Sequence, residues 1–181
     1  MTPERQLISV TMGHDADHVK IKFREITVHE AEGEGEGDKT SYNIFVVESD
    51  TIPHKDFIES MKKLRKFALA ANEIEVDSKS IGTWSISKLK ISGDHTMKQS
   101  RIVLTLSHYV KRTKKVVEMP TGQITMYPET DDASKFPDVD KMTPIVEDVI
   151  EECWCYIEGT KVGEESEGQL PLFPKRDPVE A

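Results

Sequence analysis

Two stretches with apolar residues at helical spacing limit the fold of this chain most strongly. Residues 53–71 and 144–158 each place apolar side chains three and four positions apart, which gives each helix one apolar stripe. The first stripe consists of Phe57, Ile58, Met61, Leu64, Ala68 and Ala71. The second consists of Met142, Ile145, Val146, Val149, Ile150, Cys153, Trp154 and Ile157. Because a helix must bury such a stripe, we expect both helices to pack on a sheet.

The segments before each helix alternate apolar and polar residues, as strands with one buried face do. They are Arg5–Met12, Val19–Val28 and Tyr42–Val47, then residues 74–76, 84–91, 102–110, 116–117 and 124–127. The alternation changes phase near Arg24-Glu25 and again between Ile86 and Leu89, so we expect irregular pairing, as at a β-bulge, in both strands. Apolar residues on both sides of 102–110 predict a central strand. No internal repeat is evident. The sequence predicts an α+β domain over residues 1–159, with mainly antiparallel sheet.

Residues with strong positional preferences mark the expected ends of the helices. Pro53 suits a first helical turn, with Thr51 or Asp50 before it as the cap. The second helix is expected to begin with Thr143 as the cap and Pro144 at the first position. Asn72 and Gly159 are the expected stops.

Several segments lack the residues to form a core. Apolar residues make up only 36% of the chain. The Gly- and Glu-rich run 32–38 predicts a flexible hairpin loop, and the acidic segment 128–137 predicts an irregular connector. Residues 160–181 are expected to form a disordered tail. Its first nine residues, Thr160–Gly168, reach about 30 Å when extended.

Net charge is −9, but residues 55–115 carry 14 Lys or Arg against 6 Asp or Glu. One face could therefore be positive and hold the phosphates of DNA, with Tyr109 as one stacking residue. The candidate nucleic-acid residues are Lys62, Lys63, Lys66, Arg101, Lys111, Arg112, Lys114 and Lys115. Lys20, Lys22 and Arg24 form a further short cationic row on the second strand. A solvated charged surface is the simpler interpretation of such clustering.

Patterns typical of catalysis are weak. The segment His14–His18 has no recognised metal-ligand spacing and falls in an expected turn. Asp131, Asp132, Asp138 and Asp140 share one connector, whereas the magnesium ligands of nucleases normally sit on rigid strand ends. No phosphate-binding loop, serine nucleophile elbow or dinucleotide fingerprint is present. We therefore expect no cofactor, no metal and no catalytic residues, and an enzyme is the less favoured interpretation.

The compartment follows from the cysteines and from the hydropathy. Cys153 and Cys155 flank Trp154 at a spacing too short for an ordinary disulfide or a metal knuckle, and both are expected to act as small apolar residues. No run of residues approaches the length of a membrane span or of a signal-peptide core. We expect a cytoplasmic, reduced protein without membrane contact.

The C-terminal tail contains one apolar peptide, Gln169-Leu170-Pro171-Leu172-Phe173. Pro171 fixes its own φ and biases Leu170 to the extended region, so the peptide is partly shaped for binding. Leu172 and Phe173 are suited to fill a pocket on another molecule, and Gln169 to hydrogen-bond at its edge. The peptide resembles the one by which bacterial polymerases and mismatch-repair proteins bind the DNA sliding clamp. Pro171 departs from that pattern, where a small polar or acidic residue is common.

This resemblance covers five residues, and it implies a partner without implying an activity. It leads us to expect a bacterial or bacteriophage accessory protein of DNA replication, repair or recombination, held at the sliding clamp and able to bind DNA weakly. The small size and the tail are also similar to those of bacteriophage accessory proteins. Alternatives are an inhibitor that occupies the clamp pocket, a clamp-tethered nuclease, and a structural or assembly protein. The sequence does not predict the oligomeric state.

Overall fold

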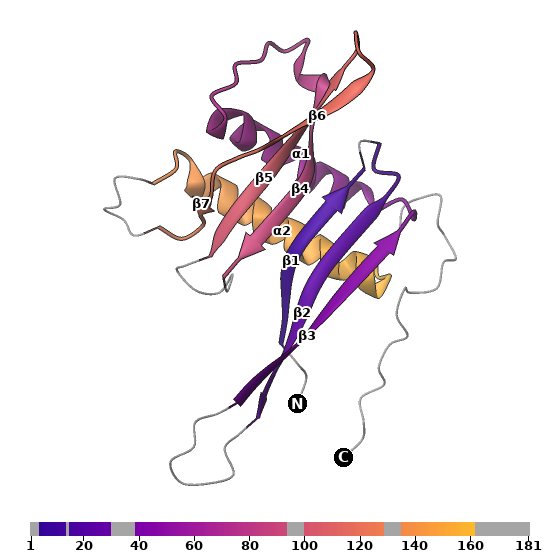
Figure 1. The fold of residues 1–181 in the computed structure, drawn as a ribbon, viewed down its shortest axis with the longest axis vertical. Helices are drawn as coiled ribbons and strands as arrows, with labels where there is room; N and C mark the ends of the chain where they lie inside the picture. The colour runs from indigo at the N-terminus through magenta and orange to yellow at the C-terminus, as the bar shows by residue number, and fades with distance from the viewer. Residues whose placement is uncertain (1–3, 14, 30–38, 94–99, 129–134, 162–181) are drawn as a thin grey trace.

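One antiparallel sheet with two helices on one face makes up the described chain (Figure 1). The computed structural model describes residues 4–13, 15–29, 39–93, 100–128 and 135–161. The strands are β1 (Glu4–Met12), β2 (Val19–His29), β3 (Lys39–Ser49), β4 (Trp84–Ser92), β5 (Arg101–Val110), β6 (Lys115–Pro120) and β7 (Ile124–Thr125). The helices are α1 (Lys55–Ala71) and α2 (Val139–Glu158), with one 3₁₀ turn, η1 (Ile81–Thr83). The predicted α+β class is confirmed.

The strand order is β3-β2-β1-β4-β5-β6, and β7 pairs with β5. This order describes two similar halves, each with three successive antiparallel strands followed by a helix: β1-β2-β3-α1 and β4-β5-β6-α2. The halves meet where β1 pairs with β4, at Ser9–Lys90, Val10–Leu89 and Thr11–Lys88. The chain therefore repeats its topology about the pair Val10–Leu89, a repeat that the sequence does not reveal.

Each half contains one β-bulge at the equivalent position. In β1, Ile8 is the extra residue, because Leu7 pairs with Phe23 and Ser9 with Lys22. In β4, Ser87 is the extra residue, because Ile86 pairs with Leu106 and Lys88 with Thr105. Ile8 lies two residues before Val10, and Ser87 lies two residues before Leu89, so the bulges follow the same twofold relation.

The bulge expected in the second strand is therefore wrongly placed. β2 pairs with β3 without a register shift from Val19 to His29, and the irregularity opposite Phe23 and Lys22 belongs to β1. The phase change in β2 has another cause, since Ile26 and Val28 extend beyond the part of the sheet that the helices cover and are half-buried and exposed. The phase change in β4 is confirmed as a bulge.

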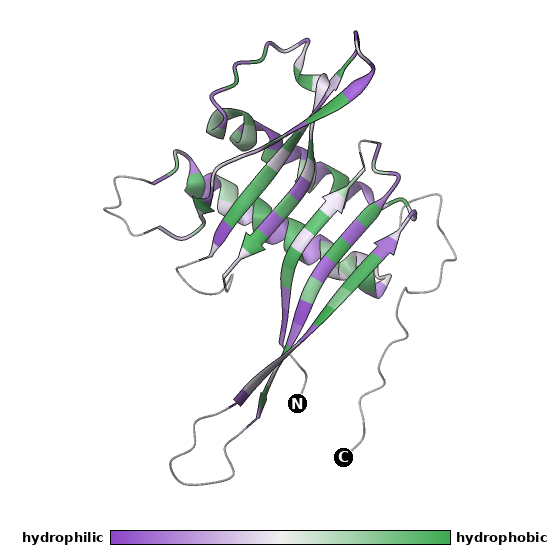
Figure 2. Ribbon diagram, in the orientation of Figure 1, coloured by the Kyte–Doolittle hydropathy of each residue, from purple (hydrophilic) through white to green (hydrophobic). Residues whose placement is uncertain are grey.

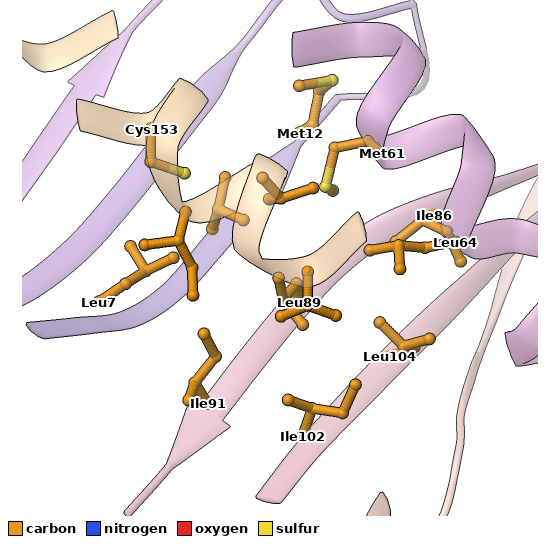
Figure 3. Close-up of a cluster of buried hydrophobic side chains, with 14 of the residues drawn as sticks. Leu7, Met12, Met61, Leu64, Ile86, Leu89, Ile91, Ile102, Leu104 and Cys153 are labelled. Carbon is orange, nitrogen blue, oxygen red and sulfur yellow. The ribbon is translucent and has the colours of Figure 1, made fainter. Parts of the chain in front are cut away.

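The core fills the space between the sheet and the two helices (Figure 3). The bulges let Leu7 and Val10 of β1, and Ile86 and Leu89 of β4, all face the helices. α1 packs on β4 and β5. α2 reaches β2, where the Trp154 ring meets the Phe23 ring edge-on at 5.4 Å between centroids. Cys153 is fully buried, and burial raises the pKa of its thiol well above the ordinary value.

Helix α2 begins earlier than its capping residues suggest. It starts at Val139, so Pro144 lies inside the helix. Thr143 is a buried helical residue whose one hydroxyl proton is shared between the carbonyls of Met126 and Val139, both at 2.9 Å. Val139 and Met142 are fully buried, so the burial of one more apolar turn outweighs the hydrogen bond that Pro144 removes. Gly159, with φ 66°, ends the helix as expected.

Two further expectations need correction. α1 is preceded by His54, whose Nδ1 accepts a hydrogen bond from the Asp56 amide at 3.3 Å, so neither Thr51 nor Asp50 is the cap. Ile74 and Val76 lie in the connection after Asn72 and belong to no strand. The predicted interior position of β5 is confirmed, since β5 pairs with β4 on one side and with β6 and β7 on the other. The predicted stop of α1 at Asn72 is confirmed.

A truncation at the centre of the sheet should destabilise the whole molecule. Leu89 is fully buried and pairs with Val10 and Leu104. We expect Leu89→Ala to lower the free energy of unfolding by about 2–5 kcal/mol, because it leaves a cavity where the two halves meet. Val117→Ala, at a residue that is 45% exposed on β6, should change it by no more than about 0.5 kcal/mol. Urea denaturation followed by circular dichroism measures both, and similar losses would contradict this packing.

Candidate nucleic-acid interface

The basic residues predicted from the sequence lie on three separate parts of the structure. Lys62, Lys63 and Lys66 are exposed on α1, in the helical layer. Lys111, Arg112 and Lys114 form the turn between β5 and β6, and Lys115 begins β6. Arg101 begins β5, at the opposite end of that strand from the turn. The structure does not bring these residues into one patch.

Two of the α1 lysines already interact with neighbouring side chains, which makes them less available to bind phosphate. Lys62 forms an ion pair with Glu59 at 2.8 Å, and the Lys66 ammonium lies 4.8 Å from the centre of the Phe67 ring. Lys66 also lines a pocket of about 800 Å³ between the end of α1, β7 and the start of α2. Two other lysines of that pocket, Lys135 and Lys141, are paired with Asp140 and Asp138.

A different group of cations gathers on the face of the sheet opposite the helices, which we call the open face. It is the face turned toward the viewer in Figure 1, and no described helix covers it. The strand register places Lys20, Lys22 and Arg24 of β2, Lys88 and Lys90 of β4, and Arg101 of β5 on this face. Hydrophilic segments alternate with hydrophobic ones along these strands in Figure 2, as expected for strands with one covered face.

Four of these cations, which we call the open-face lysines, frame two small hydroxyl residues. One cross-strand row runs Lys22–Ser9–Lys90, and the next runs Lys20–Thr11–Lys88. Neighbouring strands lie about 4.8 Å apart, so the two lysines of a row have backbones about 10 Å apart. Alternate residues of one strand are about 7 Å apart, so the four lysines outline a rectangle of about 10 by 7 Å. The side chains of Ser9 and Thr11 are short, so the centre of this rectangle does not rise above the sheet as far as the lysines do.

The electrostatics of the four lysines are unequal. Lys20 forms an ion pair with Glu48 at 3.1 Å. In the described ranges, no carboxylate lies within 4.0 Å of the ammonium groups of Lys22, Lys88 and Lys90. The acidic residues of this face lie at its margins: Glu4, Glu48 and Glu118. Among the described residues, the middle of the open face is therefore a positive surface.

Polar and aromatic side chains extend this surface on both sides. Arg24 donates hydrogen bonds to the side-chain Oε1 of Gln6, and its guanidinium carbon lies 5.5 Å from the centre of the exposed Tyr42 ring. Tyr109, half-buried, lies on the same face at the far end of β5. Phosphates suit the lysines and bases can stack on tyrosines, so the open face has the chemistry to hold an extended nucleic-acid strand without reading its sequence.

The sequence prediction missed Lys88 and Lys90. The signal was present, since residues 87–91 read Ser-Lys-Leu-Lys-Ile and Leu89 and Ile91 are buried, which turns both lysines outward. The sequence does not predict that β4 lies beside β1 and therefore two strands from β2, which contains the cationic row. Of the predicted nucleic-acid residues, only Arg101 shares the open face with that row.

Other candidate residues are dispersed. His18, beside the open face, contacts Asp50 and Glu48 through its two ring nitrogens, at 2.6 and 3.0 Å. Asp138 and Asp140 are paired with lysines, whereas His14, Asp131 and Asp132 lie outside the described residues. Within the residues that the structure describes, no group of three potential metal ligands is found, and no helix is long and apolar enough to cross a membrane. The peptide 169–173 also lies outside the described residues.

The acidic residues Asp50 and Glu48 beside the open face should raise the pKa of His18. Hydrogen bonding to Asp50, and then to Glu48, raises the pKa of His18 above its ordinary value of 6.5. The stabilisation from the charged ring is complete below pH 6.5 and is lost as the pH rises through the raised pKa. An NMR titration of the His18 ring should show the raised value, and Asp50→Asn should lower it. A wild-type pKa at or below 6.5 would contradict the contacts.

Comparison of the chain with protein-family models, with curated proteins and with solved structures finds no match. The function is therefore inferred from the residues and the geometry of this chain alone.

Proposed function

We propose that this chain is a bacterial or bacteriophage accessory protein of DNA replication, repair or recombination that acts at the DNA sliding clamp. In this proposal the peptide Gln169–Phe173 binds the clamp, and the open face of the sheet holds the phosphate backbone of DNA at the same place. The observation that carries the second half is the set of three lysines, Lys22, Lys88 and Lys90, without acidic partners in the described residues.

The peptide supports the choice of partner. Leu172 and Phe173 are large apolar residues close to the C-terminus, where Glu, Gly and Pro dominate. Each contributes about 1.5–3 kcal/mol when it is buried in a partner's pocket. After the cost of ordering the peptide, an affinity on the order of micromolar is expected. Such an affinity permits exchange with the other proteins that use the same pocket.

The open face supports the choice of DNA as the second ligand. Its cations are arranged in rows across the sheet, and hydroxyl residues lie between them, so contacts to successive phosphates of an extended strand are favourable. A few phosphate contacts give an affinity of about 10⁻⁴ to 10⁻⁶ M at physiological salt. Alone, this is too weak to place the protein on DNA when its net charge is −9.

Linkage of the two weak sites removes this difficulty. The clamp encircles DNA, and the nine residues Thr160–Gly168 allow a reach of at most about 30 Å between domain and peptide. A short link of this kind gives an effective concentration in the millimolar range. For a dissociation constant of about 10⁻⁴ M, that concentration favours the DNA-bound state by about tenfold. The clamp peptide thus selects the location, and the open face acts only there.

The first test concerns the peptide. Leu172→Ala with Phe173→Ala should abolish binding to a purified bacterial sliding clamp in surface plasmon resonance, because both pocket-filling side chains are removed. The melting temperature should not change, since in this proposal the peptide binds a partner and takes no part in the core. A drop of several degrees would show that the peptide belongs to the fold, and the clamp proposal would then fail.

The same assay separates recruitment from inhibition. We expect the full chain and a synthetic peptide of residues 168–174 to bind the clamp, in the absence of DNA, with affinities within about threefold of each other. A full chain that binds about a hundredfold more tightly would mean that the domain itself grips the clamp. Inhibition of the clamp would then replace the accessory role.

The second test concerns DNA. Fluorescence anisotropy with single-stranded DNA should show weak binding that collapses between about 50 and 200 mM salt. The triple variant Lys22→Glu, Lys88→Glu, Lys90→Glu should abolish it. The matched control, Lys62→Glu, Lys63→Glu, Lys66→Glu on α1, makes the same change in net charge and should retain most of the binding.

Two outcomes would count against the open face. Equal losses in both triple variants would mean that binding follows net charge and has no defined site. Loss only when Lys111, Arg112, Lys114 and Lys115 are changed to Glu would assign the site to the β5–β6 turn, as the sequence alone suggests.

A further inference from the structure

The two edges of the sheet differ in how they are protected from pairing with another strand. β6 is six residues long, ends in Pro120, and carries Lys115 and Glu118. Short length, proline and charge all discourage edge-to-edge association. β3 is eleven residues long, has no proline, and carries charge only at Lys39 and Glu48, near its two ends. It pairs regularly with β2 over its whole length, and no described strand pairs with its outer side.

β3 also presents apolar side chains to solvent. Tyr42, Ile44 and Val46 are 57%, 61% and 51% exposed, and they lie on the open face at alternate positions. The intervening Phe45 and Val47 face the helices, where Phe45 stacks on Phe23 with 5.2 Å between ring centroids. The side chains of β3 that face the helices thus anchor the strand, while no described strand pairs with its outer edge and its apolar row on the open face is exposed. This combination is typical of an interaction surface.

The geometry points to a second copy of this chain as the occupant: we propose that β3 pairs antiparallel with β3 of another molecule about a twofold axis at Ile44. Ile44 is the middle residue of Lys39–Ser49. In this register Ile44 of one molecule lies opposite Ile44 of the other. Tyr42 of each molecule lies opposite Val46 of the other. The three exposed side chains of each molecule then form one continuous apolar patch.

The charges at the ends of β3 are compatible with this arrangement. Lys39 meets Ser49 of the second copy, and Glu48 meets Thr40. No like charges therefore lie directly opposite each other in this register. A register shifted by one residue would turn the apolar row of one copy to the opposite face from that of the other. The pattern of the strand is therefore complementary to itself, as a twofold interface requires.

The pairing has a structural consequence. A twofold axis perpendicular to the sheet leaves the open faces of both copies on the same side. The cationic rows of the two molecules would then belong to one extended surface, with Lys22 and Arg24 of each copy nearest to the interface. The dimer does not depend on DNA or clamp binding, so its test is separate from those of the proposed function.

Sedimentation velocity of the full chain between about 5 and 200 µM tests the dimer, because a single edge-to-edge contact is small and its affinity is expected in the micromolar range. We expect the wild type to shift from monomer to dimer over this range. Ile44→Lys should remain a monomer throughout, since two like charges directly opposite each other would replace the apolar centre. Val117→Lys, the matched change at an exposed valine of the opposite edge, should dimerise as the wild type does.

A cross-link supplies a second measurement if Ile44→Lys fails to fold. Residues directly opposite in an antiparallel pair have Cα atoms about 4.5–5.5 Å apart, which is within the range of a disulfide. Ile44→Cys should therefore form a covalent dimer under mild oxidation, whereas Val117→Cys and the wild type, with its own Cys153 and Cys155, should not. A wild type that stays monomeric at every concentration would overturn the proposal. So would a dimer that survives Ile44→Lys, or an Ile44→Cys protein that does not cross-link.

Discussion

The sheet is continuous only through the short contact between β1 and β4, because its other strands belong to two units, β1-β2-β3 and β4-β5-β6 with β7. Only the pairs Ser9–Lys90, Val10–Leu89 and Thr11–Lys88 connect the strands of these units. A bulge on each side of this contact turns Leu7 and Ile86 toward the helices together with Val10 and Leu89. The junction is therefore stabilised mainly by the apolar side chains buried beneath it.

The placement of both helices on one side of the sheet determines what the other side can do. All large apolar residues of β1 and β4 other than the bulged Ile8 and the half-buried Trp84 are buried on the helix side. The same alternation necessarily sends Ser9, Thr11, Lys88 and Lys90 to the open face. A sheet with helices on both faces would have needed apolar residues at these positions. The open face is thus a consequence of a two-layer fold, and its positive charge is the feature that the fold does not require.

The proposed contacts with DNA and with a second copy use different surfaces and do not obstruct each other. The β3 edge lies beside the cationic rows and faces sideways from the sheet, whereas phosphates would approach perpendicular to it. The peptide proposed to bind the clamp belongs to the chain after α2, and α2 ends on the helix side, where Glu158 pairs with Arg5 at 3.4 Å. The open face, the β3 edge and the end of α2 are therefore three separate places on the described domain.

Local patterns in the sequence determined which segments form strands and helices and where most of them end. Alternation in β2 and β5, the stripe of α1, and the stops at Asn72 and Gly159 all depend on neighbouring residues, so the sequence alone predicts them. The start of α2 was predicted wrongly, because the burial of Val139 and Met142 by distant strands outweighs a local capping signal. The bulge in β1 was also missed, because the extra residue Ile8 is itself apolar and alternates with Val10 and Met12, which hides the change of phase after Leu7.

Only the tertiary structure decided which charged residues share a surface. Lys22 and Lys90 are far apart in the sequence. The sequence-based prediction grouped the basic residues of α1 with those of the β5–β6 turn, because both sets lie within residues 55–115. Pairing of β1 with both β2 and β4 brings Lys22 and Lys90 to the two sides of Ser9, and the helical layer separates the α1 lysines from them. The peptide Gln169–Phe173, proposed to bind the clamp, is the opposite case. Its five residues are contiguous and need no fold to be recognised, so the sequence alone suggests it.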